Sequence, residues 1–148
     1  MSIVYFDSSA FVKLLINESG SQLAGDLWTG CDAAVASRLA YPEVRAALVA
    51  AHRSRRLRSA ELERAEVTWE RVWAATRPVE MTHVITLHAG QLARDHALSG
   101  ADALHLASLL SVGRAETVMA AWDMRLRTGA VATGVQLVPR DLEPSDTV

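Results

Sequence analysis

Several features are scarce or absent in this sequence of 148 residues, and each narrows the classes of protein that it fits. Cys31 is the only cysteine, so an internal disulfide bond is excluded, and the paired cysteine spacings of structural zinc sites are missing. No apolar run approaches the roughly 20 residues that a membrane-spanning helix needs. The N-terminal apolar run follows no basic segment and is interrupted by Asp7, which does not fit a signal peptide. We therefore expect a cytoplasmic protein that makes no contact with a membrane.

An excess of positive charge is absent as well. The formal net charge is −2, so the chain carries no global signature of polyanion binding. Lys13 is the only lysine, and arginine, which suits bidentate contacts with phosphate, makes up the other basic residues. Arg53, Arg55 and Arg56 lie in one basic stretch. Two interpretations are open: a solvated helix end whose charges compensate the helix dipole, or a patch that contacts phosphates at the rim of a nucleic-acid site.

What is present is a regular alternation of apolar patterns. Half of the residues are hydrophobic, enough for the core of one domain. Short apolar runs predict strands at residues 3–6, 33–37, 78–82, 117–121 and 135–138, and longer periodic segments predict helices at 8–17, 21–29, 42–51, 59–76, 83–97, 101–112 and 124–127. Strands separated by helices predict a three-layer α/β/α sandwich around a mostly parallel sheet. We expect a single domain over residues 1–140, followed by a polar tail at 141–148.

The most distinctive stretch surrounds Asp7. A predicted strand ends on this carboxylate, and Ser8 and Ser9, which follow, can cap a helix. In open parallel sheets, ligands bind at the carboxyl ends of the strands, so Asp7 is a candidate functional residue. The alternative is that Asp7 only caps the next helix. Ser8 has two interpretations of the same kind: it orients a water or a phosphate group, or it caps the helix.

Three further carboxylates occupy comparable positions. Asp123 follows the predicted strand at 117–121. Glu43 follows Pro42, which favours the first turn of a helix, where a carboxylate complements the helix dipole. Asp102 follows the potential cap Ser99 and begins a helix that is apolar on nearly all sides, which is typical of a buried central helix. Each carboxylate alone fits a structural role, but four such positions together indicate a shared site.

A site built from Asp7, Glu43, Asp102 and Asp123 has a definite chemistry. Ionised carboxylates in one pocket repel one another, and a hard divalent cation removes that penalty. Oxygen ligands without cysteine or histidine select Mg²⁺ or Mn²⁺. Mg²⁺ keeps several of its waters, and one of these can attack a phosphodiester bond. We therefore predict that all four carboxylates are catalytic and metal-binding residues of a hydrolase that cleaves phosphodiester bonds.

Two other features have open interpretations. His105 follows Asp102 by about one helical turn and could be a general base, but we interpret it as a packed histidine because metal-activated water needs no such base. Trp69 and Trp73 are one turn apart and share a helix face. Such a face lies in a core or, when partly exposed, in a protein interface.

Four segments together resemble a known family: Ile-Val-Tyr-Phe-Asp7-Ser-Ser-Ala, Tyr41-Pro-Glu43-Val, Gly100-Ala-Asp102-Ala-Leu-His-Leu-Ala and Trp122-Asp123-Met-Arg-Leu. They resemble the PIN-domain nucleases, and in particular the VapC toxins of type II toxin–antitoxin systems. The resemblance covers nearly the whole chain, and the segment that begins at Asp102 is its most specific part. One departure is Ala121, because the family often has threonine or serine two residues before the last aspartate.

The resemblance implies a PIN-like fold and an Mg²⁺-dependent endoribonuclease. The implied metal ligands are Asp7, Asp102 and Asp123, with Glu43 helping to hold the metal or its water. The implied partners are an RNA substrate, a VapB-like antitoxin and a second copy of the chain in a homodimer. We expect the antitoxin to cover apolar surface on the helices that carry Trp28, Trp69 and Trp73.

Rival classes fail on particular residues. A receiver domain needs a lysine at a late strand end, and Lys13 lies on the first predicted helix instead. A haloacid-dehalogenase phosphatase needs a second aspartate two residues after the first, and that position is Ser9. Two alternatives stay open: a PIN-like module that binds RNA or a partner without cleavage, and a structure-specific DNA nuclease that uses the same site.

Overall fold

The computed structural model describes residues 2–146, so the last two residues of the predicted tail lie outside the described part. The strands are β1 (Ile3–Phe6), β2 (Ala33–Ser37), β3 (Arg77–Val79), β4 (Thr117–Ala120) and β5 (Gln136–Val138). The α-helices are α1 (Ser8–Leu15), α2 (Ser21–Gly30), α3 (Ala40–Arg53), α4 (Ser59–Ala74), α5 (His83–His96), α6 (Gly100–Val112) and α7 (Met124–Ala132), and a 3-10 turn, η1, covers Pro144–Asp146. None of these helices is long and apolar enough to cross a bilayer.

The five strands form one parallel sheet with the order β3-β2-β1-β4-β5. β1 is central, and its Ile3 pairs with Ala33 of β2 on one side and with Thr117 of β4 on the other. The chain builds outward from β1 to β3 and then returns to place β4 on the free side of β1. A parallel sheet binds ligands beyond the carboxyl ends of its strands where the strand order reverses. In this sheet that point lies between β1 and β4.

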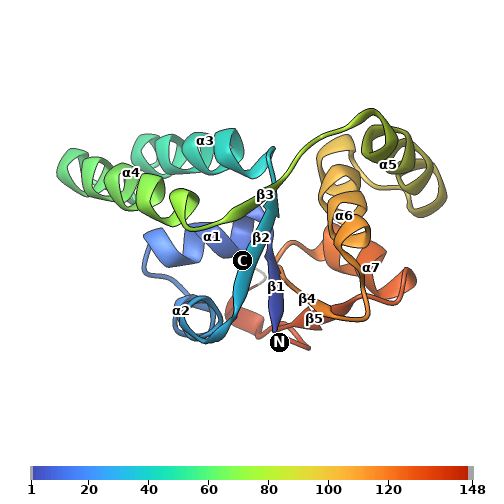
Figure 1. Cartoon of the computed structure of the whole chain (residues 1–148). Helices are drawn as coiled ribbons and strands as arrows, with labels where there is room; N and C mark the ends of the chain where they lie inside the picture. Colours follow the sequence, from blue (N-terminus) through green and yellow to red (C-terminus); the bar gives the residue numbers. More distant parts are fainter. Residues whose placement is uncertain (1, 147–148) are drawn as a thin grey trace.

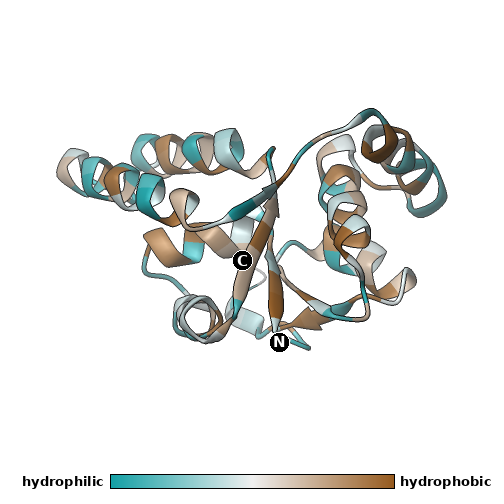
Figure 2. Cartoon of the chain, viewed as in Figure 1, coloured by the Kyte–Doolittle hydropathy of each residue, from teal (hydrophilic) through white to brown (hydrophobic). Residues whose placement is uncertain are grey.

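Helices cover both faces of the sheet, as Figure 1 shows: α1 to α4 lie on one side, and α5, α6 and α7 lie on the other. The strand sequences explain the arrangement, because successive side chains point to opposite faces. Val4 and Phe6 of β1 pack with the first helical layer, whereas Tyr5 packs with the second. The strands are accordingly mostly hydrophobic in Figure 2. The predicted three-layer α/β/α fold is confirmed, and every strand pair is parallel.

The tryptophan face predicted on the fourth helix belongs mainly to the core. Trp69 is completely buried, and its ring centroid lies 5.0 Å from that of Phe11 and 5.5 Å from that of Trp73. Trp73 and Trp28 are half-buried. We expected an antitoxin to cover apolar surface on the helices that carry these tryptophans. Trp69 itself cannot belong to that surface, because it packs against Phe11 in the core.

Most predicted elements agree with the structure to within one or two residues at each end, and two differ by more. β3 is Arg77–Val79 and not 78–82, because Thr82 caps α5 and its hydroxyl accepts a hydrogen bond from Ile85 N at 3.3 Å. α7 continues to Ala132, well beyond the predicted end at residue 127. Gly129 lies within this longer helix at a position where a Cβ would lie 2.9 Å from a methyl carbon of Leu98.

Candidate active site

Asp7 lies directly beyond β1, at the point where the strand order reverses. Its backbone N–H donates to Ala120 O at 3.2 Å, so it also lies beside the end of β4. Only 3% of the residue is exposed, and Oδ1 accepts hydrogen bonds from Ala10 N at 2.8 Å and from Ser9 Oγ at 2.6 Å. Burial raises the pKa of Asp7 to about 6, although both hydrogen bonds favour the charged form. Among the described residues no donor is bound to Oδ2, so that oxygen remains available to a ligand.

Glu43 reaches the same edge of the sheet from the first turn of α3. Its Oε1 accepts from Ser8 Oγ at 2.6 Å and lies 2.5 Å from His105 Nε2. Burial pushes the pKa of Glu43 upward, but the hydrogen bonds from His105 and Ser8 outweigh it, so the pKa is lowered. Glu43 therefore carries its negative charge at neutral pH and holds it in a fixed orientation.

Asp102 lies in the first turn of α6, where Ser99 caps the helix by accepting from Asp102 N at 3.1 Å. Its side chain is half-buried. Burial raises the pKa of Asp102, and the negative charges of Asp123 and Glu43 raise it further. The pKa of Asp102 is therefore affected by carboxylates from two distant parts of the chain.

Asp123 completes the set from the loop after β4. It is exposed and caps α7, with Oδ1 accepting from Leu126 N at 3.0 Å. Its charge raises the pKa of both Asp7 and Asp102, after the larger effect of burial in each case. The four predicted carboxylates are thus brought to one edge of the sheet.

The chemistry of this donor set fits a hard divalent cation, because its ligand atoms are carboxylate oxygens. The side chains are not preassembled, however: within residues 2–146, no three aspartate, glutamate, histidine or cysteine side chains form a group that could hold a metal ion. Asp7 Oδ1 and Asp123 Oδ1 are occupied by helix capping. A cation at this site would therefore be bound by the second carboxylate oxygens of Asp7 and Asp123.

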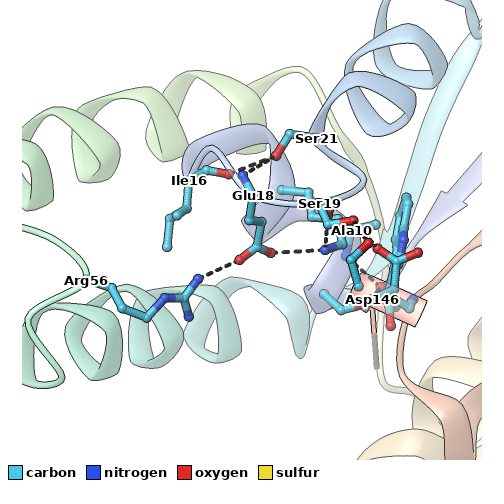
Figure 3. A network of polar contacts seen from close by, with 12 residues as sticks. Ala10, Ile16, Glu18, Ser19, Ser21, Arg56 and Asp146 are labelled. Carbon is cyan, nitrogen blue, oxygen red and sulfur yellow. Dashed lines mark hydrogen bonds and ion pairs between the residues drawn. The ribbon is translucent and has the colours of Figure 1, made fainter. Parts of the chain in front are cut away.

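The basic stretch lies away from these carboxylates. Arg53 ends α3 ten residues after Glu43, about 15 Å further along the helix axis. Arg56 Nη2 is 2.6 Å from Glu18 Oε2, and Lys13 Nζ is 3.1 Å from the other oxygen of Glu18. Figure 3 shows Glu18 beside Arg56 in this polar network, with Ser19 near Asp146. A contact between RNA and Arg53, Arg55 or Arg56 would therefore lie well away from the acidic site.

The sequence analysis missed the polar side chains that hold these carboxylates in place. Ser9 accepts from Trp122 N at 3.0 Å while donating to Asp7, so one hydroxyl joins the ends of β1 and β4. His105 is buried, as interpreted, but it contacts Glu43 directly. A lone histidine in an otherwise apolar helix was the available signal. Ala121, where the family often has a hydroxyl, is completely buried among the helices of the second layer.

Together, the fold and the site define an α/β protein with an acidic site at the switch point of a parallel sheet, of the kind that suits a hard cation. Residues 4–132 match the PIN domain family, and the chain belongs to this family. It is 62% identical over 144 residues to "Ribonuclease VapC45" of Mycobacterium tuberculosis strain CDC 1551 / Oshkosh and, equally, to "Ribonuclease VapC49" of strain ATCC 25618 / H37Rv. Each match covers 97% of this chain and 100% of the relative. The family resemblance predicted from the sequence is confirmed, and PIN-domain ribonucleases as a family depend on metal ions.

Proposed function

We propose that this protein is a metal-dependent endoribonuclease and acts as the toxin of a VapBC-type toxin–antitoxin module. The observation that supports the proposal is that Asp123, in the loop after β4, raises by its charge the pKa of both Asp7 at the end of β1 and Asp102 at the start of α6, in addition to the larger effect of burial. The two relatives named as VapC ribonucleases, which match nearly the whole chain, support the same activity.

We further propose Mg²⁺ or Mn²⁺ as the cofactor, held by Asp7, Asp102 and Asp123 with help from Glu43. Such an ion, when bound, supplies an activated water and neutralises charge that develops on the phosphate. Asp7 offers an oxygen from a buried, capped position, which limits its motion. Glu43 keeps a negative charge beside the site. Ser8, whose proton is donated to Glu43, can still accept a hydrogen bond from a water or substrate hydroxyl and so orient it.

The partners follow from the family. We propose a VapB-like antitoxin, an RNA substrate and a homodimer, and a cytoplasmic location, where such an antitoxin and RNA are found together. We also propose that residues 1–140 form the single nuclease domain and that 141–148 form a polar tail. Arg53, Arg55 and Arg56 remain candidates for RNA contact outside the acidic site.

A cleavage assay tests the activity. Purified protein is incubated with a pool of single-stranded RNA, with Mg²⁺, with Mn²⁺ or with EDTA, and flapped DNA is tested in parallel. We expect RNA cleavage that needs the metal and that is lost in Asp102→Asn. RNA binding without cleavage would indicate the non-cleaving module, and preferential cleavage of flapped DNA would indicate the DNA nuclease. Either result would overturn the proposal.

A further inference from the structure

A buried row of hydrogen bonds connects the centre of the sheet to Glu43. The backbone N–H of Ser37, the last residue of β2, donates to the Tyr5 hydroxyl at 3.1 Å. The Tyr5 hydroxyl lies 2.8 Å from His105 Nδ1, and His105 Nε2 lies 2.5 Å from Glu43 Oε1. Tyr5 belongs to β1, His105 to α6 and Glu43 to α3. The row therefore links the two helical layers across the edge of the sheet.

The direction of each hydrogen bond follows from the chemistry of its ends. A backbone N–H can only donate, so Tyr5 accepts from Ser37. The phenol proton of Tyr5 then has His105 Nδ1 as its acceptor. The remaining ring proton lies on Nε2 and is donated to Glu43, since an ionised carboxylate can only accept. When His105 accepts at Nδ1 and donates at Nε2, every hydrogen bond in the row has one donor and one acceptor.

Core packing alone does not account for these residues. Tyr5 is completely buried and His105 is 3% exposed, and burial of their polar atoms is unfavourable unless each finds a partner. Around them, the second core contains apolar side chains such as Leu106, Leu109 and Met119. An apolar pair would fill the same space without that cost. What Tyr5 and His105 add is a directed hydrogen bond to a single oxygen of Glu43.

We propose that Tyr5 and His105 are positioning residues that orient Glu43 for metal binding. His105 and Ser8 both contact Oε1 of Glu43, so the carboxylate is held from two sides and Oε2 is left for the metal ion or one of its waters. The proposal rests on the proposed function, because it assumes that Glu43 serves a metal site. Groups that hydrogen-bond to a ligand in this way fix its orientation, and their loss typically weakens metal affinity or activity.

The test is a double-mutant cycle in which Mn²⁺ affinity is measured on the full chain, by calorimetry or by the electron paramagnetic resonance signal of free Mn²⁺. We expect His105→Phe to weaken Mn²⁺ binding by about 10- to 100-fold. In a Glu43→Gln background, the same change should alter the affinity by less than about twofold, because the carboxylate that His105 orients toward the metal is already absent. An equal loss in both backgrounds, or no loss in either, would overturn the proposal.

Further variants guard against a general loss of structure. Leu109→Ala opens a cavity in the same helix without touching Glu43, so it should lower the melting temperature while leaving Mn²⁺ affinity unchanged. If His105→Phe does not fold, Tyr5→Phe removes only the hydroxyl that fixes the ring of His105. It should weaken Mn²⁺ binding in the wild-type background and not in Glu43→Gln. Unchanged Mn²⁺ affinity in Tyr5→Phe would then overturn the proposal.

The failure of this inference can be told apart from failure of the proposed function. If the acidic site does not bind metal at all, the wild-type chain shows no Mn²⁺ binding, and Glu43→Gln and Asp102→Asn cleave RNA as the wild type does. If only the positioning role is wrong, the wild type binds Mn²⁺ and Glu43→Gln weakens that binding, whereas His105→Phe has no effect that depends on Glu43.

Discussion

The hydroxyl of Ser9 lies 2.6 Å from Oδ1 of Asp7 and donates a hydrogen bond to it. The same hydroxyl accepts from Trp122 N at 3.0 Å, one residue before Asp123. A single side chain therefore fixes the buried carboxylate after β1 and ties it to the loop after β4. Ser9 therefore adds a side-chain link between the two strand ends to the backbone hydrogen bond from Asp7 N to Ala120 O.

Replacement of Ser9 by alanine should disturb both ends at once. Asp7 loses a hydrogen bond that favours its charged form, and Trp122 N loses its acceptor. We expect Ser9→Ala to lower the free energy of unfolding by about 1–3 kcal/mol, the usual cost of unpaired buried groups, and to reduce RNA cleavage. Urea denaturation measures the first effect. Thr128→Ala, which removes an exposed hydroxyl bonded within α7, is the control, and equal stability of the two variants would contradict this role for Ser9.

Burial of Asp7 should make the metal-free protein less stable as the pH rises. The pKa of Asp7 is about 6 in the folded chain, above its ordinary value of 3.8, so the folded state holds the proton more tightly. The stabilisation is complete below about pH 4 and is lost as the pH rises through 6. A pKa difference of about 2 corresponds to about 3 kcal/mol. Urea denaturation in EDTA at several pH values measures the slope, which should flatten in Asp7→Asn. The same slope in that variant would refute the assignment.

Replacement of Asp102 should separate activity from stability. Burial and the charge of Asp123 raise the pKa of Asp102, which means that its ionised form is unfavourable in the folded chain. We expect Asp102→Asn to reduce RNA cleavage by at least about 100-fold. Loss of a residue that only hydrogen-bonds to a metal ligand reduces activity by up to about 100-fold, and here the charge of a ligand itself is removed. Its melting temperature in EDTA should equal or exceed that of the wild type. A retained cleavage rate would show that Asp102 is not part of the site.

A divalent cation should stabilise the folded chain. Binding to the folded state alone adds about 2.7 kcal/mol at a metal concentration 100 times the dissociation constant, which raises Tm by several degrees. We expect this rise with Mg²⁺ or Mn²⁺, its reversal by EDTA, and its loss in Asp7→Asn. Thermal unfolding followed by circular dichroism measures it. The same rise in Asp7→Asn would place the cation elsewhere on the protein.

Much of the fold could be predicted from the sequence because its signals are local. The apolar run that ends on Asp7 and the cap at Ser99 each specify the end of an element within a few residues. Two limits were wrong: that of β3, which ends before the cap at Thr82, and that of α7, which continues past Gly129. Leu98 packs against Gly129, and Leu98 belongs to another part of the chain.

The candidate site was predictable only in part. The positions of the carboxylates follow from strand ends and helix starts, which the sequence reveals. Their orientation depends on Ser9, Tyr5 and His105, which act through contacts between segments up to about a hundred residues apart, such as Tyr5 with His105. The composition of the basic stretch that includes Arg56 left contact with RNA open as one of two interpretations. Composition does not show where the stretch lies, and the length of α3 places it far from the acidic edge.

Metal binding at the acidic site can be observed directly in an anomalous-difference map from crystals of this protein soaked in Mn²⁺. We expect a peak at the carboxyl edge of the sheet between β1 and β4, with Asp7 Oδ2 and Asp102 among the ligands. A peak bound by other residues, or no peak at this edge at saturating Mn²⁺, would contradict it.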